Sequence, residues 1–210
     1  MYKYIVFDFD GTLVDSRGIF LSLYNALAAK YGYAPMTADN LEYLRGLSIG
    51  ERCKVLKVPM YRLPFLASAV IKGYKAAIPS LQFNEGMQEM LRSLSAQGMP
   101  FAILSSNSKS NIKEFFTLRE MAVDAVYTSS KIFGKDKMLQ KFLKDKSLDA
   151  SEILYVGDEA RDIIACKKAR VKVAWVSWGY DSHAAITGLE PDHIINYPSE
   201  LLEIIDPVKP

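Results

Sequence analysis

Two aspartates one residue apart are the first feature of the chain that could do chemistry. Residues 4–16 read YIVFDFDGTLVDS, a strand-like run that ends in Asp8 and Asp10. Successive strand residues point to opposite faces, so both carboxylates can flank one substrate only where the strand ends and the chain bends. Gly11 permits that bend. The pattern predicts a nucleophile site, but a strand running into an ordinary Asp-Gly turn has the same sequence.

Polar residues also stand beside later apolar runs. They follow PFAIL (100–104) and EILYV (152–156), and they precede the helical pattern that starts near residue 138. The residues are Ser105, Ser106, Asn107, Lys135, Asp158, Glu159 and Asp162. A solvated lysine and acidic residues at a helix N-terminus would explain some of them individually. Coincidental caps do not explain why all of them fall at one edge of a predicted sheet.

Five runs rich in branched and aromatic residues predict the strands that carry these groups. The runs are 4–9, 100–105, 125–129, 152–157 and 171–177. From residue 84 onward, amphipathic helical stripes separate them, as in Met87, Met90, Leu91 and Leu94. This alternation predicts an α/β fold with a parallel sheet covered by helices on both faces. Such sheets bind ligands beyond the carboxyl ends of their strands.

Residues 17–80 break this rhythm, because no strand pattern occurs there. A stripe from Phe20 to Tyr31 ends at Gly32, Ser48 and Glu51 have capping-box spacing, and Pro64 suits a first helical turn. The chain therefore divides into a core, residues 1–15 and 81–210, and a small all-helical insertion, residues 16–80.

Composition narrows the class of protein. The chain has 210 residues, 50% of them hydrophobic, and a net charge of +2, so we expect a globular protein with no nucleic-acid partner. No apolar run approaches the length of a membrane span. Cys53 and Cys166 lie in different predicted units and match no metal spacing, which favours a reduced, cytoplasmic protein. We expect the tail, residues 207–210, to be disordered.

Four motifs in order give the chain a family resemblance. They are DFDGT, the strand ending at Ser105, the lysine of FGKDK and GDEARD. The chain thus resembles haloacid dehalogenase superfamily hydrolases of the phosphatase branch, similar to phosphoglycolate phosphatases, from about Tyr4 to about Leu202. The resemblance implies a Rossmann-like core with a helical cap inserted after the first motif.

The resemblance also implies roles in phosphoryl transfer. Asp8 would attack phosphorus and form an aspartyl-phosphate, and Asp10 would act as general acid and base. Lys135, with Lys137 as the alternative, would place a positive charge beside Asp8 and the phosphate. Thr12, among the substrate-binding candidates, would fix the side chain of Asp10 by a hydrogen bond.

A magnesium ion would neutralise the two anions that must meet. Its ligands would be Asp8, the Asp10 carbonyl and Asp158, with Glu159 or Asp162 supporting bound water. Ser105 and the backbone amide of Ser106 or Asn107 would bind the phosphate. In the cap, Arg45 could bind an anionic substrate tail, or it could simply end a helix.

The leading hypothesis is a magnesium-dependent phosphatase for a small soluble phosphomonoester. A sugar phosphomutase and an inorganic pyrophosphatase of the same superfamily remain open, as does a regulatory protein that binds a phosphorylated ligand without turnover. Asp10 argues against two other branches. Dehalogenases do not need this aspartate, and the pattern typical of phosphonatases has a small residue in its place.

Overall fold

Six parallel strands form one sheet in the computed structural model, which describes residues 2–129 and 134–205. The strands are β1 (Tyr4–Phe7), β2 (Phe101–Ser105), β3 (Ala125–Thr128), β4 (Ile153–Gly157), β5 (Lys172–Val176) and β6 (His193–Ile195). Their order is β3-β2-β1-β4-β5-β6. All five predicted strands are present, and β1 ends two residues earlier than predicted. The tail predicted to be disordered lies outside the described residues.

The order in which the chain adds strands to the sheet reverses at β1. The chain moves outward from β1 to β2 and β3, and then crosses to the other side of β1 to form β4. The carboxyl ends of β1 and β4 therefore meet at the point where parallel sheets of this kind bind ligands. Strand β6 was not predicted. It contributes only three residues to the edge of the sheet, a length at which side-chain periodicity gives no signal.

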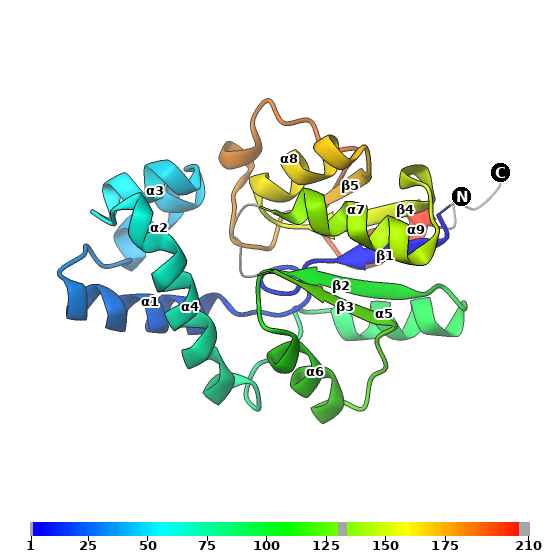
Figure 1. Cartoon of the computed structure of the whole chain (residues 1–210), viewed down its shortest axis with the longest axis horizontal. Coiled ribbons are helices and arrows are strands. Elements are labelled where there is room, and N and C mark those ends of the chain that lie inside the picture. The colour runs from blue at the N-terminus through cyan, green and yellow to red at the C-terminus, as the bar shows by residue number, and fades with distance from the viewer. Residues whose placement is uncertain (1, 130–133, 206–210) are drawn as a thin grey trace.

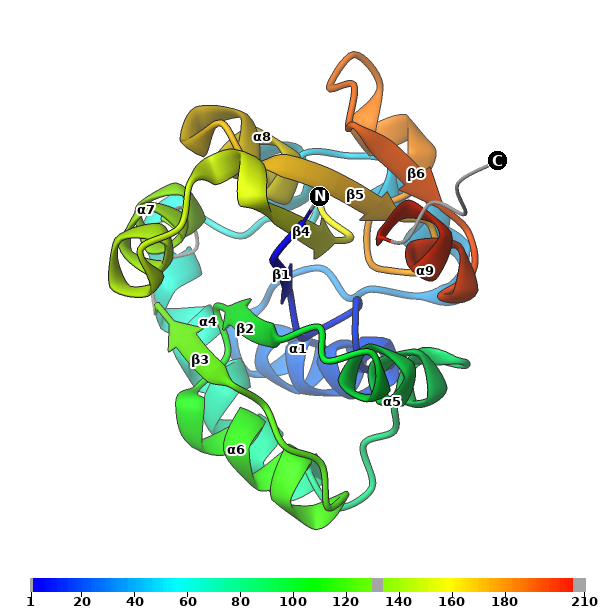
Figure 2. The same cartoon turned by 90° about the vertical axis from the view of Figure 1, so that its right-hand side faces the viewer.

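Helices cover both faces of the sheet (Figures 1 and 2). Helices α5 (Met87–Ala96), α6 (Lys109–Leu118) and α9 (Ser199–Ile205) pack on one face, in the same apolar cluster as Ile5 and Phe7. Helices α7 (Lys135–Lys146) and α8 (Ala160–Ala169) pack on the other, in the same cluster as Tyr4 and Val6. All four residues of β1 are buried, as expected for a parallel sheet covered on both faces.

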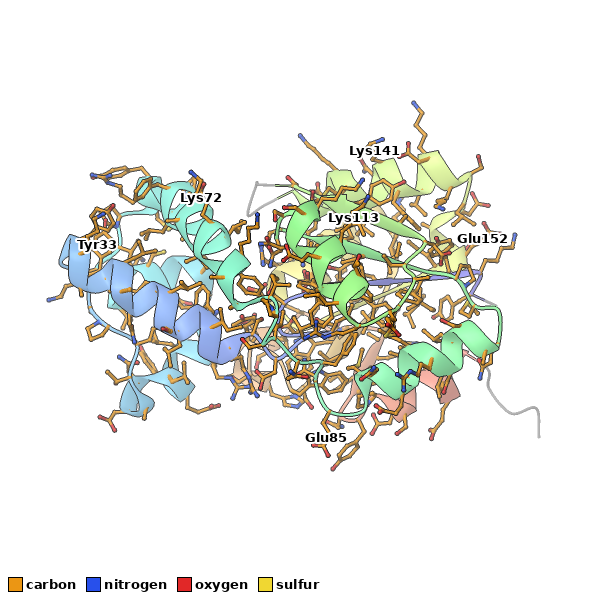
Figure 3. All side chains as sticks on the ribbon, turned by 90° about the horizontal axis from the view of Figure 1, so that it is seen from below. Tyr33, Lys72, Glu85, Lys113, Lys141 and Glu152 are labelled. Atoms are coloured by element: carbon orange, nitrogen blue, oxygen red, sulfur yellow. The ribbon has the colours of Figure 1, made fainter. Side chains whose placement is uncertain are left out.

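The insertion after β1 is helical, as predicted. It contains α1 (Arg17–Tyr31), α2 (Ala38–Arg45), α3 (Ile49–Val55) and α4 (Leu63–Tyr74), which we call the cap. The cap lies beside the sheet in Figure 1, and Figure 3 shows Tyr33 and Lys72 at the end of the molecule opposite Lys141 and Glu152. A separate apolar cluster holds the cap together. The domain boundaries at residues 15/16 and 80/81 stay a prediction.

Local signals set the ends of the cap helices. Gly32 follows α1 with a φ of 72°, a conformation that glycine adopts without strain. Ser48 and Glu51 form the predicted capping box at the start of α3, and Pro64 lies in the first turn of α4. Short 3-10 helices cover Met60–Arg62, Lys75–Ala77, Ala150–Glu152 and His183–Ile186. Within the described residues, no helix combines the length and apolar character needed to cross a bilayer.

Candidate active site

Asp8 lies at the carboxyl end of β1 and is nearly inaccessible, with 2% of its surface exposed. Its main-chain N–H donates to the Val156 carbonyl at 2.9 Å, and its carboxylate accepts the N–H of Phe9 at 2.7 Å. The chain then bends at Gly11, where φ is +78° and an added Cβ would lie 2.5 Å from the Asp158 carboxylate. Only glycine fits this turn, which brings the chain against the side chains of Asp158 and Tyr180.

Lys135 is the first residue of α7, and its ammonium group is buried between two carboxylates. It donates to Asp8 and to Asp162 in ion pairs from which solvent is almost excluded. Burial lowers the pKa of Lys135, but the charges of Asp162 and Asp8 outweigh burial and raise it, so the lysine stays protonated. The alternative, Lys137, is exposed two residues further along the helix.

Asp10 faces the space between core and cap. One of its carboxylate oxygens accepts the side-chain N–H of Asn107 at 2.9 Å. The other, Oδ1, is buried and has no hydrogen-bond partner among the described residues, and the same holds for the hydroxyl of Tyr74. Burial raises the pKa of Asp10, while the polar groups of Tyr74, Asn107 and Ser16 oppose that rise. The carboxyl group thus favours its protonated form more than an exposed aspartate does.

Thr12 makes a different hydrogen bond from the one predicted with Asp10. Its hydroxyl donates instead to Oδ1 of Asp158 at 2.7 Å, and its side chain is fully buried. Thr12 is therefore also too deep to contact a substrate directly. The sequence suggested the wrong partner for Thr12, because β4, the neighbour of β1 in the sheet, brings Asp158 to the same edge from 146 residues away. The other oxygen of Asp158 accepts the N–H of Tyr180 at 2.7 Å.

Three carboxylates converge beside Lys135. One oxygen each of Asp8, Glu159 and Asp162 lies within 4.8 Å of the others. Asp162 was predicted only as a supporting residue. Burial raises its pKa to about 6, although the charge of Lys135 opposes the rise. Glu159 pairs with Arg161, whose Nε donates at 2.8 Å, and the charges of Arg161 and Lys135 lower the pKa of Glu159 despite burial.

The acidic groups suit a divalent cation. The pKa of Asp158 is raised well above its ordinary value, first by burial and then by the charges of Glu159, Asp8 and Asp162. This repulsion shows that the carboxylates outnumber the cations that face them. Magnesium prefers oxygen ligands of this kind, and its positive charge would relieve the repulsion. The donor chemistry therefore fits the predicted metal, but the gathered carboxylates are Asp8, Glu159 and Asp162. Asp158, which was predicted as a ligand, is not part of this group.

The residues predicted to bind phosphate lie at the end of β2. Ser105 is buried, and its hydroxyl oxygen accepts the N–H of Asn107 at 3.1 Å. Ser106 lines the cavity between core and cap together with Asn107. Asn107 was predicted for its backbone amide, but its side chain holds the carboxylate of Asp10, a role that the sequence did not reveal.

Of the cap arginines Arg45 and Arg52, it is Arg52 that lines the cavity containing Asp10, whereas the sequence favoured Arg45. Arg45 donates to the carbonyls of Gly179 and Tyr180, both at 3.2 Å, and to the exposed Glu42 at 2.8 Å. Arg45 does not line the cavity that contains Asp10, whereas Arg52 does.

Arg52 forms an ion pair with the buried Asp181 and donates to the Leu44 carbonyl at 2.7 Å. Asp181 in turn accepts the N–H of Ala160, at the start of α8, at 2.7 Å. Arg52 thus connects the cap to the helix that carries the acidic residues. No local sequence pattern indicates this pair, because 129 residues separate its members.

Comparison with known proteins agrees with this geometry. The family model described as haloacid dehalogenase-like hydrolase matches residues 5–176. The chain belongs to this family. The sequence is 29% identical over 204 residues to a phosphoglycolate phosphatase of Synechococcus elongatus, covering 96% of each chain. It is also 24% identical to a pyrophosphatase of Bacillus cereus, covering 96% of this chain and 95% of that protein.

The fold has close counterparts among solved structures. A haloacid dehalogenase-like hydrolase from Streptococcus pneumoniae superposes with a TM-score of 0.80 at 20% identity, over 98% of this chain and 99% of that one. The predicted α/β fold is confirmed. The prediction of an enzyme from the phosphatase branch of this family is also confirmed, because phosphatases match along nearly the whole chain.

Proposed function

We propose that this haloacid dehalogenase-like hydrolase is a magnesium-dependent phosphatase that cleaves a small phosphomonoester through an aspartyl-phosphate on Asp8. The observation that carries the proposal is the position of Lys135. A buried ammonium group held between Asp8 and Asp162 fixes one oxygen of Asp8 and leaves a positive charge where an incoming phosphate needs it.

In the first step, a carboxylate oxygen of Asp8 attacks phosphorus and the bond to the leaving alkoxide breaks. Asp8 needs no separate base, because its carboxylate oxygen is itself the nucleophile. Lys135 reduces the repulsion between the carboxylate and the phosphate dianion. Ser105, which is buried at the adjacent strand end, would donate its hydroxyl hydrogen to a phosphate oxygen.

Asp10 supplies the proton for the leaving group. Burial raises its pKa and so favours the protonated form, Asn107 holds one of its oxygens, and Asp10 lines the cavity between core and cap. After the alcohol leaves, water attacks the aspartyl-phosphate. The ionised Asp10 then takes a proton from this water, so Asp8 and Asp10 both return to their initial states.

Asp8, the Asp10 main-chain carbonyl, Asp158, Glu159 and Asp162 are the residues that would hold magnesium. When bound, the metal supplies charge neutralisation for the phosphate and its attacking carboxylate. Within the protein, Thr12 and the N–H of Tyr180 orient Asp158 toward this role, and Arg161 orients Glu159.

Replacement of the nucleophile tests the proposal. Asp8→Asn should reduce hydrolysis of a generic aryl phosphate by several orders of magnitude, since loss of a nucleophile costs about 10⁶-fold in other covalent enzymes. Asp15→Asn is a matched control, because Asp15 is exposed and its carboxylate pairs, among the residues that the structure describes, only with Arg17 at 3.2 Å. Acid-quenched Asp10→Asn protein should carry phosphate on Asp8 by mass spectrometry. Retained activity in Asp8→Asn would sink the assignment.

The same assay separates the alternatives. EDTA should stop turnover and added Mg²⁺ should restore it; full activity in EDTA would remove the metal from the proposal. Inorganic diphosphate as the preferred substrate would indicate a pyrophosphatase, and isomerisation of a sugar phosphate would indicate a mutase. No turnover over a panel of phosphorylated metabolites would favour a binding protein.

A further inference from the structure

A cavity of about 240 Å³ runs from the catalytic edge of the sheet into the cap. Asp10, Ser106 and Asn107 lie at its core end. The rest of its wall consists mainly of aliphatic and aromatic side chains from α1, α3, α4 and the segments that join them. They include Tyr24, Met36, Leu56, Leu66, Val70 and Ile71. The polar groups are thus concentrated near the reacting carboxylates, and the wall away from them is apolar.

The cationic side chains of the wall are already paired. Among the described residues, only Arg52 and Arg161 line the cavity with positive charge. Arg52 is held by Asp181 and by the carbonyls of Leu44 and Arg45, and Arg161 is held by Glu159. A second anionic group on a substrate would share a guanidinium group with the carboxylate that already neutralises its charge. An uncharged group would face no such competition.

The size of the cavity limits what it can hold. An apolar cavity of roughly 150 Å³ in another protein binds benzene. The present cavity is about one and a half times as large, enough for one aromatic ring with a short linker. An empty apolar space also forfeits the dispersion contacts that its lining atoms would make with an occupant. A hydrocarbon group that enters it from Asp10 would regain these contacts.

We propose that the leaving group of the substrate is an uncharged, largely apolar body about the size of an arylalkyl alcohol, seated in this cavity with its oxygen beside Asp10. The proposal rests on the phosphatase function proposed above and names its substrate class. The phosphate lies among Asp8, Ser105 and Lys135, and the hydrocarbon part extends into the cap. Small phosphorylated acids do not fill this space, and their carboxylate meets no unpaired cation among the described residues of the wall.

A matched substrate series tests this choice. Ethyl phosphate, 2-phenylethyl phosphate and 2-phosphoglycolate all release a primary alkyl oxygen, so they differ mainly in what enters the cap. One methylene in an apolar pocket is already worth at least 10-fold in specificity. We therefore expect kcat/KM for 2-phenylethyl phosphate to exceed that for ethyl phosphate by about 100-fold or more. We expect 2-phosphoglycolate to be no better than ethyl phosphate.

Filling the cavity provides a second test. Ala67 lines the cavity from α4, whereas its neighbour Ser68 is exposed and does not. Ala67→Phe should remove most of the preference for 2-phenylethyl phosphate and leave turnover of ethyl phosphate within about threefold. Ser68→Phe should change neither. Turnover of ethyl phosphate reports that the variant is folded, and Val70→Phe repeats the test if Ala67→Phe fails to fold.

The outcomes separate the two proposals. Hydrolysis of all three esters with 2-phosphoglycolate strongly preferred would overturn the apolar leaving group and leave the phosphatase intact. Equal kcat/KM for ethyl and 2-phenylethyl phosphate in the wild-type protein would do the same. Absence of hydrolysis of every ester, with Mg²⁺ present, would refute the phosphatase itself.

Discussion

Removal of Arg52 should destabilise the protein in a pH-dependent way. Arg52 is the cap's charged contact with the core segment that follows β5, through its ion pair with Asp181. The side chains are 18% and 6% exposed, so solvent cannot replace the lost partner. Arg52→Met keeps much of the apolar stem and removes only the charge and its hydrogen bonds. Asp181 then keeps the Ala160 N–H as its remaining donor.

The size of the effect follows from the pKa of Asp181. Burial raises it to about 6, although Arg52 opposes the rise. Any stability that this carboxyl contributes is therefore fully present below about pH 4, the unfolded pKa, and is lost as pH rises through about 6. Without Arg52 the pKa rises further, and the loss continues to higher pH. Each additional unit is worth about 1.4 kcal/mol at a pH above the new pKa. A rise of two units would therefore add about 3 kcal/mol of pH-dependent loss there and almost none at pH 5.

This figure agrees with the roughly 3–5 kcal/mol that removal of one partner from a buried ion pair costs elsewhere. Urea unfolding of wild type and Arg52→Met at pH 5 and pH 8 would measure it. In a chain of this size, about 3 kcal/mol corresponds to roughly 6–12 °C in melting temperature.

Two further variants complete the experiment. Arg45→Met should show a loss that hardly varies with pH, because its acceptors in the core are neutral carbonyls. Asp181→Asn combined with Arg52→Met should abolish the pH dependence. A stability difference between Arg52→Met and wild type that is the same at pH 5 and pH 8 would refute the reasoning.

Three other substitutions test particular contacts. Gly179→Ala should lower the free energy of unfolding by about 1–3 kcal/mol and remove most activity, because the added Cβ would overlap the side chain of Asp158. Gly50→Ala, with open space around it, should be tolerated, and urea unfolding and turnover assays compare the two variants. Thr12→Val should cost about 1–3 kcal/mol, since a buried carboxylate oxygen loses its donor, and equal unfolding midpoints would contradict this role. Burial raises the pKa of Tyr24 to about 12, so the stability that its neutral phenol contributes is present below pH 10 and is lost as pH rises toward 12. Tyr24→Phe should lose less stability than wild type between pH 9 and pH 11 in urea titrations.

The sequence was sufficient to predict which strand ends meet. Parallel strands place their carboxyl ends at one edge, so residues far apart in sequence, such as Asp8 and Asp158, had to approach each other there. Lys135 follows the same logic, because it begins a helix that returns from that edge. The apolar residues of each strand themselves indicate that it is buried, and so the core of the sheet could be predicted. The three-residue strand β6 could not, since it depends on pairing with β5.

It was harder to predict which side chains bond to one another at that edge than to predict which residues lie there. Thr12 lies two residues from Asp10 in sequence, which favoured a local hydrogen bond, but the tertiary contact with Asp158 prevails. The two cap arginines show the same difficulty. Arg45 and Arg52 are both near helix ends in a loosely patterned region, and their sequence neighbours do not reveal which one lines the cavity. The way the cap packs on the core decides it.

The segment 177–182 explains why those details were beyond the sequence. Much of its bonding uses main-chain groups: the N–H of Tyr180 on Asp158, and the carbonyls of Gly179 and Tyr180 on Arg45. Main-chain groups are the same in every residue, so such contacts leave no pattern to detect. Yet this segment touches the acidic site on one side and the cap on the other. The N–H of Tyr180 bonds to Asp158 while the carbonyl of the same residue bonds to Arg45, so one stretch of chain holds an acidic side chain and a cap arginine without a recognisable sequence motif.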